Sequence, residues 1–141
     1  MRCCRLGQVR CLTVVAVVLT SGCITGPDSE RVIGTVDTSR PSFFVTPDVV
    51  TAGQAFTVQV TTTLGGCDRP GEAEVAVTAT TATVTPYDIR DAKGRNCAAV
   101  LVYFDHSAVI TFSAVGDATI VLQARDESGQ PIEVSRSVVV Q

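Results

Sequence analysis

Apolar residues recur at every second position in short runs along most of this chain, and turn residues separate the runs. Within residues 55–63, for example, Phe56, Val58 and Val60 alternate with polar side chains. This period places one face of a strand against a core and leaves the other face in water. The pattern shows no sustained period of 3.6 residues, so it predicts β-strands and no amphipathic helix.

Repetition of this pattern, with Gly, Pro and Asp between the runs, predicts an all-β antiparallel sandwich of about seven to eight strands. We expect the folded domain to span residues 42–141. Two polar segments, residues 64–71 and 87–96, are predicted to be loops, because Gly, Pro and charged residues in them interrupt the apolar alternation. The expected strands are residues 43–46, 55–63, 72–80, 81–85, 98–104, 109–114, 119–125 and 132–140.

The first 22 residues have a different pattern from the rest of the chain. Arg2, Arg5 and Arg10 precede an apolar run at residues 11–19, and small residues follow it. This is the layout of a secretory signal peptide, and the run is shorter than the roughly 18 residues that a spanning helix needs. We therefore expect residues 1–22 to be a cleaved signal peptide. Residues 23–41, rich in Gly, Pro and Ser, are expected to form a short tether, to which Ile33 and Val36 could still add an edge strand.

The end of this leader, Leu-Thr-Ser-Gly-Cys at residues 19–23, resembles the lipobox of bacterial lipoproteins. The resemblance implies that Cys23 is acylated through sulfur and becomes the mature N-terminus. The residue after the cysteine is Ile24 and not Asp, and in this the chain resembles lipoproteins that are sorted to the outer membrane. The alternative is an ordinary secretory signal that happens to end near a cysteine.

Two cysteines remain once the leader and Cys23 are set aside. Cys67 and Cys97 would then lie in an exported domain, where an oxidising environment favours one disulfide. The alternatives are two free thiols, or a metal pair whose further ligands are not evident. A disulfide would join the two predicted loops at their junctions with strands.

Two segments resemble parts of bacterial immunoglobulin-like and PKD-like modules. Residues 49–60 resemble the opening of these modules, and residues 112–126, with an apolar residue, a Gly turn and an alternating strand, resemble their end. Ala118 stands where a corner tyrosine is usual, and the chain has no Trp. The resemblance implies an Ig-like sandwich, and it carries no antibody-like binding role.

Charge excludes one class of partner. The chain of 141 residues has a formal net charge of −3, and the leader contributes three arginines and no acid, so the remainder carries −6. Nucleic-acid binding depends on Lys and Arg that neutralise phosphates, so we expect no nucleic-acid partner. The mature length suits one domain with its own core.

Few residues could carry chemistry. The only histidine stands in Asp105-His106-Ser107, and three adjacent residues do not form a catalytic triad along one another, so we expect a turn histidine. The acidic pairs Asp88/Asp91 and Asp126/Glu127 lack the spacing of a calcium loop and are expected to be solvated turn carboxylates. We expect no metal, no cofactor and no catalytic residue.

The sequence therefore predicts a non-catalytic binding or structural module, anchored by lipid in the bacterial cell envelope, most readily at the outer membrane. Envelope proteins or glycans are the expected partners. Tyr87, Arg90 and Arg95 are the candidate contact residues, because a disulfide would stiffen the loop that carries them. The alternative is a small exported hydrolase or enzyme inhibitor, for which His106 should line a pocket with a carboxylate and a hydroxyl.

Overall fold

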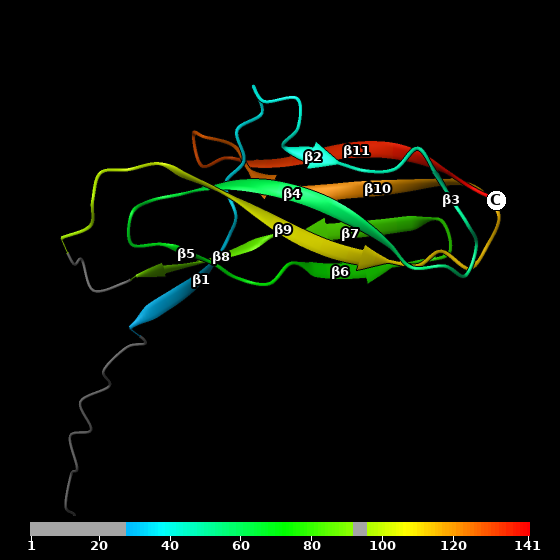
Figure 1. Ribbon diagram of the computed structural model, residues 1–141, viewed down its shortest axis with the longest axis horizontal. Helices are drawn as coiled ribbons and strands as arrows, with labels where there is room; N and C mark the ends of the chain where they lie inside the picture. The colour runs from blue at the N-terminus through cyan, green and yellow to red at the C-terminus, as the bar shows by residue number, and fades with distance from the viewer. Residues whose placement is uncertain (1–27, 92–95) are drawn as a thin grey trace, which may run out of the picture.

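The computed structural model describes residues 28–91 and 96–141, and it is an all-β fold (Figure 1). No described segment forms a helix long and apolar enough to cross a membrane. Within this part of the chain there are eleven strands, three of which are only two residues long: β1 (Ser29–Ile33), β2 (Phe44–Val45), β3 (Val49–Val50), β4 (Phe56–Leu64), β5 (Arg69–Pro70), β6 (Glu74–Val77), β7 (Thr81–Thr85), β8 (Tyr87–Asp91), β9 (Val102–Ile110), β10 (Gly116–Arg125) and β11 (Pro131–Val140).

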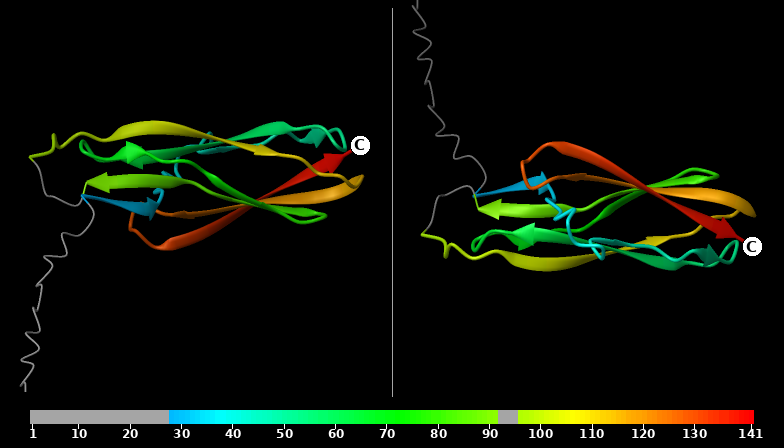
Figure 2. Two further views of the ribbon diagram at one scale, coloured as in Figure 1. Left: turned by 90° about the horizontal axis from the view of Figure 1, so that it is seen from below. Right: turned by 90° about the horizontal axis from the view of Figure 1, so that it is seen from above.

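The strands form three hydrogen-bonded sheets with the orders β3-β11-β10-β7-β6, β2-β4-β9 and β1-β8-β5. The views in Figure 2 show β4 and β9 in one layer and β10 and β11 in the other. Antiparallel pairing predominates, as in the ten-residue register of β10 with β11. Two pairings, β10 with β7 and β11 with β3, are parallel. Alternation of apolar residues does not reveal strand direction, so these two parallel pairings could not be predicted from it.

Pro86 separates two of the sheets. It lies fully buried between β7 and β8, and it has no backbone N–H to continue a ladder. Before Pro86 the chain pairs with β6 and β10, and after it the chain pairs with β1 and β5. The Pro86 carbonyl accepts a 2.9 Å hydrogen bond from the Gly34 N–H. The large sheet, through β7, and the small sheet β1-β8-β5, through β8, are therefore joined directly at Pro86.

The apolar core lies between the two large layers. It is built from the inward residues of β4, β7, β9, β10 and β11, together with Phe43, Phe44 and Phe112. Phe56 is partly buried, and its ring centroid lies 5.9 Å from that of Phe112. No residue of β1, β5 or β8 belongs to the described core cluster. The small sheet must therefore be held by other contacts.

The described structure differs from the predicted elements in several segments. Residues 29–33 form β1 and Val36 is fully buried, so the fold begins within the segment that was expected to be a tether. Residues 87–91 form β8 rather than a loop. Residues 105–107 lie inside the continuous strand β9, where a turn was expected. In both strands a buried polar side chain occupies an inward position, and this hides the alternation.

Candidate functional site

A buried polar cluster joins the small sheet to the layer that contains β4 and β9. Thr62 on β4, Asp88 on β8 and His106 on β9 are all at most 4% exposed. His106 Nε2 lies 2.9 Å from Thr62 Oγ1 and 3.1 Å from Asp88 Oδ1, and the Thr62 hydroxyl lies 3.2 Å from the same carboxylate oxygen. These contacts connect three strands from two sheets.

The second ring nitrogen of His106 is also occupied. Nδ1 lies 3.1 Å from the carbonyl oxygen of Gly71, to which it donates because a carbonyl only accepts. Gly34 closes another side of the cluster, since a Cβ at this position would lie 2.6 Å from Thr62 Cγ2. No buried side-chain nitrogen or oxygen in the described residues lacks a partner. Satisfied networks of this kind rigidify the structure around them.

The cluster is not arranged as a nucleophile, base and orienting acid. In that arrangement the hydroxyl and the carboxylate contact opposite nitrogens of the imidazole. Here Thr62 and Asp88 both contact Nε2, and Gly71 occupies Nδ1. A shallow surface pocket does include His106, Asp105 and Ser107, but the histidine side chain is only 2% exposed.

Two expectations about these residues were wrong. His106 is a buried strand residue, not a turn residue, and Asp88 is a buried hydrogen-bond acceptor, not a solvated carboxylate. Asp126 does lie in a turn, where its Oδ1 accepts hydrogen bonds from the backbone N–H groups of Ser128 and Gln130. No group of three metal-ligating side chains gathers within the described ranges.

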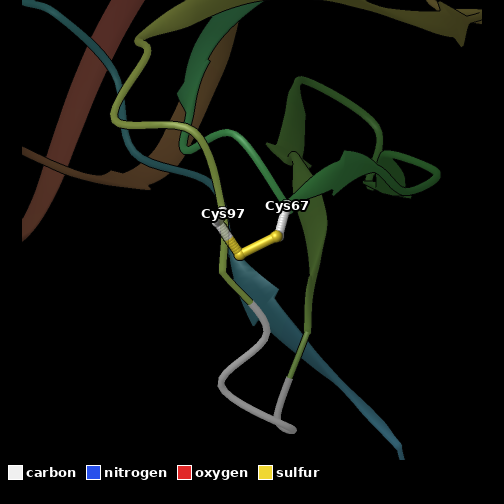
Figure 3. Close-up of a disulfide and its surroundings, with 2 residues drawn as sticks. All are labelled: Cys67 and Cys97. Atoms are coloured by element: carbon white, nitrogen blue, oxygen red, sulfur yellow. A yellow bond between two sulfur atoms is a disulfide. The ribbon is translucent and has the colours of Figure 1, made fainter.

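A disulfide joins Cys67 to Cys97 beside the small sheet (Figure 3). Their Cα atoms lie 5.2 Å apart, and the bridge closes a separation of 30 residues. On the chain-entropy model a loop of this length stabilises the fold by about 3–4 kcal/mol. The two segments also touch through their backbones, since a Cβ at Gly66 would collide with the carbonyl oxygen of Ala98. The predicted pairing of the cysteines is confirmed.

The predicted contact residues lie on β8 or outside the described structure. Tyr87 is half-buried, and its ring stacks beneath the Arg31 guanidinium, 3.5 Å from the ring centroid. Arg31 also pairs with Glu74 at 2.7 Å. Arg90 is exposed opposite Glu30 and lines the same surface groove of about 500 Å³ as Tyr87. Arg95 lies outside the described residues, as do the signal peptide and Cys23.

Residues 100–104 form an exposed apolar segment that was not predicted from the sequence, and we name it the apolar segment. Its five side chains, Val100, Leu101, Val102, Tyr103 and Phe104, are all more than 40% exposed. The signal in the sequence is the absence of alternation: residues 98–104 are seven consecutive apolar residues without a polar one among them. A half-buried strand should alternate, so this run indicated either full burial or an exposed apolar surface.

Tyr103, within this segment, contacts two charged side chains, Arg40 and Asp37. Its ring lies under the Arg40 guanidinium at 4.0 Å, and its hydroxyl donates to Asp37 Oδ2 over 3.4 Å. Asp37 also accepts hydrogen bonds from the Ser39 backbone N–H and hydroxyl. These contacts lower the pKa of Asp37 below its ordinary value of 3.8, and the Ser39 hydroxyl has the largest effect.

No protein-family model matches this chain, and neither a curated protein nor a solved structure resembles it significantly.

Because of the buried cluster, we expect removal of the Asp88 carboxylate to destabilise the fold more than removal of the Asp105 carboxylate. Asp88→Ala removes the buried carboxylate that contacts His106 Nε2 and accepts from the Thr62 hydroxyl, so it should lower the free energy of unfolding by about 2–4 kcal/mol. Asp105→Ala is the control, because Asp105 is exposed and accepts a hydrogen bond from the Thr61 hydroxyl across the strand pair. It should lower this free energy by no more than about 0.5–1 kcal/mol. Urea unfolding measures both, and equal small losses would contradict a structural role for the cluster.

The Asp37 contacts predict a stability change in acid. The pKa of this carboxyl is lowered in the folded state, so its stabilisation is present above 3.8 and is lost as pH falls through the folded pKa. Carboxyl-carbon NMR should show Asp37 titrating below 3.8 in the native protein. Ser39→Ala should raise that midpoint and reduce the loss of stability in acid. A midpoint above 3.8 in the native protein would overturn this interpretation.

Proposed function

We propose that this protein is a bacterial lipoprotein in which acylated Cys23 anchors one Ig-like β-sandwich to a cell-envelope membrane as a non-catalytic binding or structural module. The sequence of residues 1–23 supports the anchor through its resemblance to a lipobox. Resemblance of residues 49–60 and 112–126 to bacterial Ig-like modules supports the domain type.

The single observation that carries the proposal is the short distance along the chain between Cys23 and the first strand. β1 begins at Ser29, so only six residue steps separate the cysteine from the folded sheet. Such a chain spans at most about 20 Å when fully extended. A module attached in this way stays next to the membrane and does not sweep through a large volume.

A non-catalytic role is favoured by the state of the only histidine. Both His106 ring nitrogens are within hydrogen-bond distance of protein atoms, and the side chain is only 2% exposed. A general base must reach the proton that it removes. Of the remaining polar surfaces, the groove beside Tyr87 and Arg90 suits an envelope protein or glycan, because it combines an aromatic ring with arginine side chains.

Intact and peptide mass of the native protein, extracted from its own membranes without reduction, tests the anchor. The N-terminal peptide should begin at a Cys23 that carries fatty acyl groups, with Cys67 joined to Cys97. Cys23→Ser should abolish acylation and release the mature domain from the membrane fraction. Cys11→Ser, which changes a cysteine within the leader, is the matched control and should behave as the native protein does. An N-terminus elsewhere without lipid would remove the basis of the proposal.

A further inference from the structure

We propose that the apolar segment docks on the surface of the bilayer beside the lipid anchor, with Val100 and Leu101 inserted among the lipids. This inference rests on the proposed function, because it takes acylated Cys23 as the anchor. It adds a second membrane contact, made by the folded domain itself.

The segment differs from the rest of the described surface because its exposed apolar residues are consecutive in the chain. Val100 is 52% exposed and Leu101 62% exposed, and the next three side chains are 41–47% exposed. Other exposed large apolar residues of the described ranges stand singly in the chain: Val45, Val49, Val77, Val109, Val115 and Val139. Single exposed apolar residues are ordinary, whereas a contiguous exposed run marks an interaction surface.

The topology explains why this run stays uncovered. β9 is an edge strand of its sheet, and only β4 pairs with it among the described strands. Val102 and Phe104 are on the same face of β9 as buried His106, but they lie nearer the end of the sandwich. Residues 100 and 101 precede the strand and have no ladder partner in the described structure.

The segment lies at the end of the sandwich where the chain enters from its N-terminus. Asp28 and Ser29 line one pocket together with Cys67, and the disulfide joins Cys67 to Cys97, three residues before Val100. The C-terminus lies at the opposite end in every view (Figures 1 and 2). An anchor on Cys23 would therefore hold this end of the domain toward the membrane.

The short tether makes even a weak surface contact effective. Six residue steps limit the separation of Cys23 and Ser29 to about 20 Å. Confinement of this kind acts as a high effective concentration of lipid surface at the nearby apolar segment. The disulfide adds to this effect, because it fixes the base of residues 98–101 against the folded domain.

The composition of the segment selects apolar insertion over charge attraction. Residues 96–104 contain no charged side chain, and the mature chain carries a net charge of −6, which anionic headgroups repel. Tyr103 suits the interface between headgroups and acyl chains, where aromatic residues with a polar end gather. Docking should therefore occur on zwitterionic lipid and should depend little on salt.

A single tryptophan tests this docking, because the native chain has none. We would introduce Leu101→Trp into the mature acylated protein, reconstituted in vesicles of phosphatidylcholine with brominated acyl chains. The matched control is Val115→Trp, since Val115 is 72% exposed and precedes Gly116, which pairs with Val140 at the far end. Brominated lipid should quench the residue 101 reporter about twofold or more and leave the residue 115 reporter almost unchanged.

Each other outcome overturns the docking. Absence of quenching at residue 101, with acylated Cys23 confirmed by mass, would remove the docking and leave the anchor in place. Equal quenching at residues 101 and 115 would show that the domain has no preferred end. Blue-shifted emission at residue 101 without quenching, in a sample that light scattering shows to be dimeric, would assign the segment to a second copy of the chain. Absence of acyl groups on Cys23 would remove the proposed function and the docking together.

Discussion

The attachment of the small sheet β1-β8-β5 is the constraint on which the rest of the structure depends. This sheet contributes no residue to the described core cluster, so burial of apolar side chains in that core does not hold it. Other features do: the contact of Asp88 with His106 and Thr62, the disulfide beside β5, and the backbone hydrogen bonds of residues 34–36 with β10 and β4. A buried, satisfied carboxylate and a covalent bond both define geometry more strictly than apolar contact does.

This attachment also determines what the end of the domain can do. The disulfide stiffens residues near Cys67 and Cys97, and stiff segments lose less conformational entropy when they bind. The N-terminal strand, the groove beside Tyr87 and the apolar segment therefore share one rigid end. Under the proposed lipid anchor that end faces the bilayer, which makes the membrane itself the nearest binding partner.

Sequence patterns predicted the parts of the fold in which one strand face is apolar and the other polar. Residues 55–63 and 119–125 became β4 and β10 with small shifts, and the pairing of Cys67 with Cys97 was correct. The pattern failed where a polar residue points inward: Asp88 made β8 resemble a loop, and His106 made the middle of β9 resemble a turn. Both are buried because they bond each other, and a contact between residues 18 apart is invisible to local periodicity. The apolar run at residues 98–104 left burial and exposure open, since the outcome depends on which strand lies beside β9.

The height of the C-terminus above the bilayer tests the central claim, an anchored domain whose disulfide end faces the membrane. A fluorescent donor would be placed at Leu101 or at Gln141 in the acylated protein, with acceptor-labelled lipid in the vesicle. The ten-residue strands β10 and β11 are about 33 Å long, so energy transfer from residue 141 should be far weaker than from residue 101. Equal transfer from the two positions would contradict the account.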